Sequence, residues 1–129
     1  FNMDSLIRFG FSIDEIKNMM DTNIYISTSS DSSIKQLINI LEKCKCNDKQ
    51  IKSILICNPF YLNKDISSVK ELIKNLKNMG FKNLNILFCA NPYILNLDCN
   101  DFQEIVKGLK DKGFTDKKII DYFNYNLVI

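Results

Sequence analysis

The chain has 129 residues, of which 46% are hydrophobic and 25% charged, and these values are ordinary for a globular domain with a real core. A net charge of +2 without any histidine permits an acidic partner but does not require one. No apolar run approaches the roughly 18 residues that cross a membrane, and the start, FNMDSLIRFG, lacks the basic and apolar regions of a signal peptide.

The first predicted elements are three helical segments. Residues 4–9 are typical of the end of a helix. A short helix is predicted over 12–22, because Ser12-Ile-Asp-Glu15 is a capping box, in which the first side chain accepts from a free backbone N–H and the fourth reaches back. A longer helix is predicted over 33–44, where Ser33-Ile-Lys-Gln36 has the same pattern.

The next elements repeat this order and add a proline. A short helix is predicted over 47–57, from a capping box that starts at Asn47. The stretch CNPFYLN ends this helix, because Pro59 disfavours the α conformation for the residue before it. The apolar residues that follow are too few for a strand, and we interpret them as a single 3₁₀-like turn. A longer helix over 68–79 then begins at the cap Ser68.

The remaining elements complete the series. A short helix is predicted over 83–90, followed by the stretch ANPYILN, which predicts a second turn of the same kind. A longer helix over 101–112 begins at the cap Asp101, and a last short helix over 115–124 has Thr115 in the capping place. We expect four apolar side chains of the two proline turns to fill the gaps between neighbouring helical hairpins: Phe60, Leu62, Tyr93 and Leu95.

Every predicted helix has one apolar face. The short helices place apolar residues at i, i+3 and i+4, and the longer ones at i, i+3, i+4 and i+7. The short-helix faces are Ile16, Met19 and Met20; Ile51, Ile54 and Leu55; Leu84, Leu87 and Phe88; Ile119, Tyr122 and Phe123. The long-helix faces are Ile34, Leu37, Ile38 and Leu41; Val69, Leu72, Ile73 and Leu76; Phe102, Ile105, Val106 and Leu109.

The same pattern recurs along the whole chain. The asparagines that end the short helices are at positions 23, 58, 91 and 126, so their spacings are 35, 33 and 35. A glycine–aromatic pair precedes three of the short helices, at Gly10, Gly80 and Gly113, and Lys45-Cys46 replaces it in the second copy. This period predicts an all-α superhelical array of about four helix–helix–3₁₀ repeats of 33–35 residues, in one domain over 1–129.

The chain ends just after the fourth asparagine. Tyr125, Leu127, Val128 and Ile129 then have no following helix to cover them. We expect either that more repeats belong to a longer array or that the C-terminal end pairs with another chain, because an exposed apolar patch usually marks an interface.

These residues resemble a known family. A glycine–phenylalanine pair, a polar cap, an amphipathic helix that ends in N-P-x-h-L and a second amphipathic helix that ends in L-x-x-x-G-F are similar to the mitochondrial transcription termination factor (mTERF) repeat. The match is best from Cys46 to Phe114, and Ile24 and Leu127 stand in for proline in the outer copies. The resemblance implies helix–helix–3₁₀ units in a curved superhelix, and a regulator that binds DNA or organellar RNA along a positively charged groove.

Lysines at equivalent positions are the candidate nucleic-acid contacts. Lys70, Lys74 and Lys77 are spaced i, i+4, i+7 on one long helix, and Lys107 and Lys110 occupy the equivalents of the last two in the next repeat. Such a row could follow phosphates, with ion release supplying the affinity. Lys17 and Lys52 form a second equivalent pair on the short helices.

Two alternatives to nucleic-acid binding by these lysines remain open. One is an ordinary solvated helix face, since Glu71 and Glu104 lie between the lysines. The other is a scaffold that binds a protein partner on the concave face of the array.

Catalysis, cofactors and metals are not expected. The chain has no histidine, glycine-rich phosphate loop or G-x-S-x-G, and none of its five cysteines forms C-x-x-C. We expect Cys57 and Cys89 to be small buried hydrophobes at helix ends. Free thiols predict a reducing intracellular compartment, either a bacterial cytoplasm or an organelle matrix.

Overall fold

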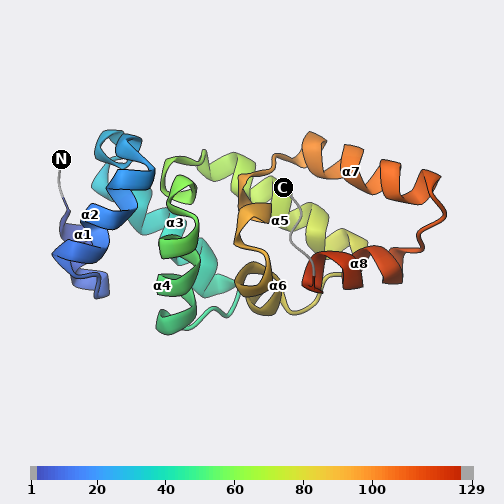
Figure 1. Cartoon of the computed structure of the whole chain (residues 1–129), viewed down its shortest axis with the longest axis horizontal. Helices are drawn as coiled ribbons and strands as arrows, with labels where there is room; N and C mark the ends of the chain where they lie inside the picture. The colour runs from blue at the N-terminus through green and yellow to red at the C-terminus, as the bar shows by residue number, and fades with distance from the viewer. Residues whose placement is uncertain (1–2, 126–129) are drawn as a thin grey trace.

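The computed structural model describes residues 3–125, which form eight α-helices and three 3₁₀ turns without a strand. The elements follow one another along the long axis of the molecule, from the N-terminal to the C-terminal end (Figure 1). In chain order they are α1 (Asp4–Phe9), α2 (Ile13–Thr22), η1 (Ile24–Thr28), α3 (Asp31–Lys43), α4 (Asp48–Cys57), η2 (Pro59–Asn63), α5 (Ile66–Met79), α6 (Leu84–Ala90), η3 (Pro92–Asn96), α7 (Cys99–Asp111) and α8 (Asp116–Tyr125).

Equivalent elements of successive repeats lie side by side. The long helices α3, α5 and α7 form one row, which α1 extends at the N-terminal end, and the short helices α2, α4, α6 and α8 form a second row. The turns η1, η2 and η3 stack as a third row. Because each repeat contacts mainly its neighbours, this is the predicted all-α repeat array. No helix in residues 3–125 is long and apolar enough to cross a membrane.

The starts of the short helices agree with the sequence. Ser12 Oγ accepts from Glu15 N at 3.0 Å while Glu15 Oε1 accepts from Ser12 N at 2.8 Å, and Asn47 and Gln50 form the same box. Thr115 Oγ1 accepts from Lys118 N at 3.3 Å. These caps depend on residues three apart in the chain, so local sequence is enough to predict them.

The predicted caps of the long helices are wrong by three residues. The N-caps are Ser30, Asp65 and Asp98, and each accepts a hydrogen bond from the backbone N–H of the residue predicted to be the cap: Ser33, Ser68 and Asp101 respectively. The long helices therefore begin at residues 31, 66 and 99 rather than 33, 68 and 101. Two capping residues three apart compete in these segments, and the helix starts at the earlier one, where the 3₁₀ turn ends.

Residues with a left-handed backbone conformation follow the helices α1, α3, α5 and α7. Gly10, Gly80 and Gly113 have φ values of 120°, 114° and 91°, which glycine adopts without a steric penalty. In the second copy Lys45 takes the same place with φ 67°, and it is the single non-glycine residue with positive φ in the described chain.

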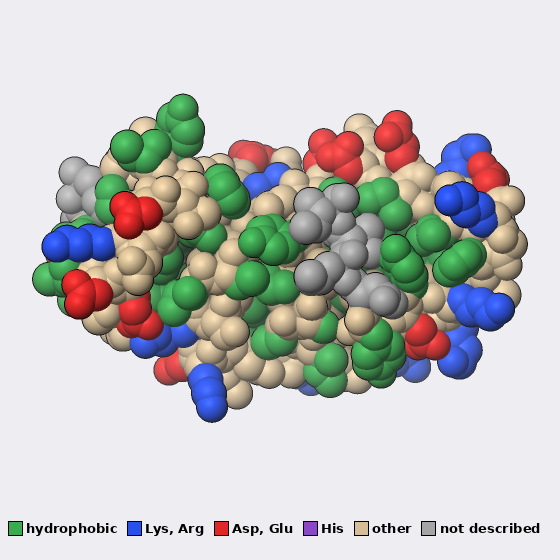
Figure 2. Space-filling model, in the orientation of Figure 1, with side chains coloured by type: hydrophobic (Ala, Val, Ile, Leu, Met, Phe, Trp, Pro, Cys, Tyr) green, Lys and Arg blue, Asp and Glu red, His purple; other side chains and the backbone are tan. Residues whose placement is uncertain are grey.

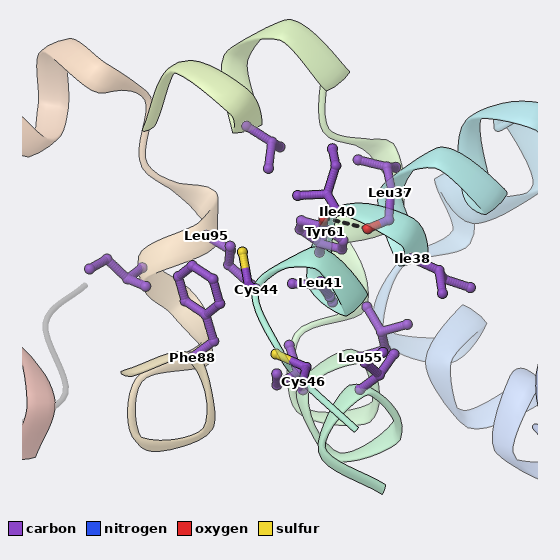
Figure 3. Close-up of a cluster of buried hydrophobic side chains, with 14 of the residues drawn as sticks. Leu37, Ile38, Ile40, Leu41, Cys44, Cys46, Leu55, Tyr61, Phe88 and Leu95 are labelled. Carbon is purple, nitrogen blue, oxygen red and sulfur yellow. Dashed lines mark hydrogen bonds between the residues drawn. The ribbon is translucent and has the colours of Figure 1, made fainter. Parts of the chain in front are cut away.

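The predicted apolar faces form a continuous core. Val69, Leu72 and Leu76 are at most 1% exposed, as are their counterparts Ile34, Leu37 and Leu41 in α3. On α7 only Phe102 is fully buried, while Ile105, Val106 and Leu109 are partly exposed. Tyr61 lies at the centre, where its hydroxyl donates to Leu37 O at 2.6 Å (Figure 3).

The proline turns seal the repeats with different side chains from those predicted. Leu62 and Leu95 are buried as expected, but Phe60 is 44% exposed and Tyr93 is only partly buried. Their neighbours Tyr61 and Ile94 occupy the core instead. A 3₁₀ turn has three residues per revolution, so Pro59 and Leu62, three positions apart, lie on the same buried side. Phe60, the residue after the proline, therefore points outward.

The asparagine of each motif bonds to the next repeat. Asn23 Nδ2 donates to Pro59 O at 3.2 Å and to Asn63 Oδ1 at 2.7 Å. Asn58 Nδ2 makes the equivalent bonds one repeat later, to Pro92 O at 3.0 Å and Asn96 Oδ1 at 2.9 Å. Both asparagines are at most 3% exposed, so these bonds form a buried polar ladder between the turns.

The cysteine prediction is half wrong. Cys57 and Cys89 lie at or near helix ends, but both are exposed because they point away from the core face. The buried thiols are Cys44 and Cys46, which follow α3. Burial raises the pKa of the Cys46 thiol to about 12, so this group is an inert part of the core.

Candidate nucleic-acid interface

A groove runs between the long helices α3 and α5, and we call it the α3–α5 groove. Its apolar floor comes from both helices and its polar rim contains three lysines, and none of its lining residues in the described part of the chain is a carboxylate. Its volume is about 210 Å³. The lining residues are Gln36, Asn39, Ile40, Lys43 and Cys44 from α3 and its C-terminal cap, and Ile66, Lys70, Ile73 and Lys77 from α5.

The three lysines of this groove are free to bind an anion. Lys43, Lys70 and Lys77 form no ion pair with any described residue. Lys77 lines this groove beside Cys44, the residue that caps α3. Burial raises the pKa of the Cys44 thiol, and the charge of Lys77 opposes this shift. The repeat pattern predicts Lys70 and Lys77 but not Lys43, because the counterparts of Lys43 in α5 and α7 are Asn78 and Asp111. Lys43 joins Lys70 and Lys77 only because α3 packs beside α5.

The next groove lies between α5 and α7, and its lysines have acidic partners. Lys107 and Lys110 line it together with Asp111, and Lys107 Nζ lies 3.1 Å from Asp111 Oδ2. Lys110 Nζ lies 3.1 Å from Asp116 Oδ1 at the start of α8. Figure 2 shows several lysine side chains and a few carboxylates at the end of the molecule formed by α7 and α8. We call this cavity the α5–α7 groove.

The structure does not place all seven predicted lysines on one surface. Lys74 is exposed and lies on α5 between the residues that face the two grooves. Lys17 is exposed on the short helix α2. Lys52 is held by the first repeat, because its Nζ donates to Gly10 O at 3.1 Å and lies 3.2 Å from Glu15 Oε1 and 5.6 Å from the centre of the Phe11 ring.

Two carboxylates line a cavity at the other end of the helices α5 and α7. Near the N-terminal ends of α5 and α7, a small cavity is lined by Ser68, Glu71, Asp98, Cys99 and Asn100. Partial burial and the Glu71 and Asp98 carboxylates raise the pKa of the Cys99 thiol. A polyanion would therefore be repelled from this cavity and attracted to the lysines near the C-terminal ends of α3 and α5.

No metal site accompanies these grooves. No group of three or more histidine, cysteine, aspartate or glutamate residues in the described chain could hold a metal ion. The predicted self-association surface includes Leu127, Val128 and Ile129, which lie outside the described residues, so that hypothesis stays a prediction. Tyr125, the last described residue, is 78% exposed.

Comparison with protein-family models matches residues 2–124 with the model described as mTERF. The match covers nearly the whole chain and confirms the family resemblance seen in the repeat motifs. Neither the comparison with curated proteins nor that with solved structures gave a match.

Proposed function

The chain belongs to the mTERF family, a family of non-catalytic nucleic-acid-binding proteins, and we propose that it binds nucleic acid in the α3–α5 groove. Family membership agrees with the prediction that the chain is not an enzyme. The proposal extends the family assignment to one surface of this chain, and to a role in regulating transcription.

One observation carries the proposal: the α3–α5 groove has three lysines that form no ion pair within residues 3–125, and none of its described lining residues is a carboxylate. Lys70 and Lys77 lie two helical turns apart on α5, and Lys43 faces them from α3. Neutralising phosphates with such lysines releases counterions, and this release supplies most of the affinity for a nucleic-acid backbone. Lys107 and Lys110 of the α5–α7 groove are secondary contacts, because they must first leave Asp111 and Asp116.

The rival function is binding of a protein partner in the same groove. Its floor contains Ile40, Ile66 and Ile73, an apolar strip that would suit an amphipathic helix with acidic flanks. Such a partner would depend on the floor, whereas a nucleic-acid backbone would depend on the lysines. The two functions therefore predict different mutations as the most damaging.

A salt-dependent titration tests the proposal. Labelled duplex DNA, single-stranded DNA and RNA would be titrated with the protein between about 50 and about 200 mM salt. Lys70→Ala and Lys77→Ala should each weaken binding by a similar factor for all sequences and lower the salt slope by up to about one unit. Lys107→Ala should have a smaller effect, and Lys118→Ala on α8 serves as the charge-matched control.

Two outcomes would refute this assignment. Unchanged binding by a variant that combines Lys43→Ala, Lys70→Ala and Lys77→Ala would exclude the groove as the interface. No measurable binding to any of the three nucleic acids at the lowest salt would favour the protein-partner function.

The free thiols fit the reducing compartment predicted from the sequence. We keep an organelle matrix or a bacterial cytoplasm as the proposed location, and mTERF proteins are typically organellar.

A further inference from the structure

A small cavity opens where the C-terminal ends of α3 and α5 meet the start of α6, and we call it the junction cleft. Its volume is about 140 Å³. Four lysines from four different segments line it: Lys43 from the last turn of α3, Lys45 from the following loop, Lys77 near the end of α5 and Lys82 from the loop before α6. The other lining residues are Cys44, Asn83, Leu84 and Asn85, so no described residue brings a carboxylate into the cleft.

The neighbouring junctions of the array neutralise their lysines. At the junction before it, Lys52 is 3.2 Å from Glu15, and at the junction after it, Lys110 is 3.1 Å from Asp116. The helices α2, α4 and α8 each have an acidic residue in the first turn, whereas α6 has none. No lysine of the junction cleft forms an ion pair within residues 3–125. Positive charge is therefore concentrated and uncompensated at this point.

Lys45 gives a second, independent sign of function. Its φ of 67° is in the left-handed region, whereas glycine occupies the equivalent position in the other three copies, at residues 10, 80 and 113. A non-glycine residue is strained in this conformation. A strained residue that places a charge in a cleft is a candidate for function rather than for stability.

We propose that the junction cleft binds a phosphate group with two negative charges, such as the terminal phosphate of a nucleic-acid strand. A phosphodiester has a single negative charge, whereas a phosphomonoester carries about −1.5 to −2 near pH 7 and offers three acceptor oxygens. Four ammonium groups without a carboxylate therefore favour the monoester. Charge-assisted hydrogen bonds of this kind are about twice as strong as neutral ones.

The position of the cleft connects it with the α3–α5 groove. Lys43, Cys44 and Lys77 line both cavities, so a strand held by its end in the cleft could continue along the groove. This part of the inference rests on the proposed nucleic-acid function. Binding of free phosphate by the cleft does not.

The experiment compares one labelled single strand in three forms: with a 5′-phosphate, with a 3′-phosphate and with hydroxyls at both ends. One phosphorylated form should bind about ten-fold tighter than the hydroxyl form, as expected for added charge-assisted bonds. Lys45→Gly should abolish this advantage, and it should fold because glycine occupies the same place in the other copies. Lys82→Ala should reduce the advantage, and Lys118→Ala should leave it unchanged.

The pH dependence separates a dianion from a diester. The advantage of the phosphorylated strand should shrink as the pH falls below about 6, where the second ionisation of a phosphomonoester reverses. An advantage that is constant across this range would overturn the dianion proposal.

The remaining outcomes distinguish the two hypotheses. Equal binding of all three strands would overturn the terminal-phosphate proposal while the proposed nucleic-acid function stands. If no strand binds, titration with inorganic phosphate tests the cleft alone. Shifts of the Asn83 and Asn85 side-chain amide signals in NMR spectra, absent in Lys45→Gly, would support a phosphate site, and unmoved signals would exclude it.

Discussion

Substitution of Asn58 by aspartate should make the stability of the array depend on pH in a new way. Asn58 is fully buried, and its Nδ2 donates to Pro92 O at 3.0 Å and to Asn96 Oδ1 at 2.9 Å in the next repeat. An ionised carboxylate has the same shape but no donor, so it would place a buried charge against two acceptors. A protonated carboxyl keeps one O–H and can restore one of these bonds.

The magnitude follows from these contacts. Asn58→Ala removes two hydrogen bonds worth about 0.5–1.5 kcal/mol each, and the loss is offset in part because Asn58 Oδ1 has no hydrogen-bond partner in the described chain. We therefore expect Asn58→Ala to lower the free energy of unfolding by at most the sum of the two bonds, about 1–3 kcal/mol. Asn58→Asp should cost more than this near pH 7, because the charge must be buried or neutralised.

The sign of the pH dependence is determined by proton linkage. Burial in the folded state raises the pKa of the introduced carboxyl, whereas in the unfolded state this pKa is about 3.9. The folded variant therefore binds more protons than the unfolded one, and its stability falls as pH rises. Between the unfolded and the folded pKa the free energy of unfolding should fall by about 1.4 kcal/mol per pH unit, relative to Asn58→Ala.

Urea unfolding followed by far-UV circular dichroism at about pH 5, 6 and 7 would measure this slope. Asn78→Asp is the matched control, because Asn78 is exposed on α5 and the same change there should alter stability by less than about 0.5 kcal/mol. If the difference between Asn58→Asp and Asn58→Ala does not vary with pH, the buried ladder does not exist as described.

Three further predictions concern the fold. Leu72→Ala should lower the free energy of unfolding by about 2–5 kcal/mol, because Leu72 is fully buried. Lys74→Ala should change it by less than about 0.5 kcal/mol. Equal effects of the two substitutions in urea unfolding would mean that the faces of α5 are misassigned. Lys45→Gly should leave the free energy of unfolding unchanged or raise it by about 1 kcal/mol in thermal unfolding. The reason is that relief of the strain at positive φ exceeds or balances the entropy that glycine adds to the unfolded chain. A clear loss of stability would contradict the positive φ of Lys45. Hydrogen bonds from Ser5 and Lys35 lower the pKa of Asp31 from its ordinary value of 3.8, so this carboxylate stabilises the fold above that pH, and acid titration should show the stability being lost as pH falls through the lowered pKa.

The candidate site could be predicted from the sequence only in part. Lysines at equivalent repeat positions predict Lys70 and Lys77, but the same repetition also predicts Lys52, which forms an ion pair with Glu15 of the first repeat. Lys43, Lys45 and Lys82 share no repeat position, since they come from α3, from the loop after it and from the loop before α6. They converge only because two neighbouring repeats pack together.

The sequence by itself determined the elements of this protein and their order. The apolar period of α3, α5 and α7, the capping boxes at Ser12 and Asn47 and the glycines after the long helices act over three to seven residues, so the local chain specifies them. These features together make up the family motif, which extends over most of the chain, and the sequence therefore predicts the architecture.

Tertiary structure decided what contacts between repeats control. It set the rotation of the proline turns, so that Tyr61 rather than Phe60 enters the core, and it selected the earlier of two competing caps at each long helix. It also gave Asn58 its partners Pro92 and Asn96, more than 30 residues away in the chain. The physical reason is the same in each case: burial, charge pairing and buried hydrogen bonding depend on which surfaces meet, and the period of one helix contains no information about its neighbour.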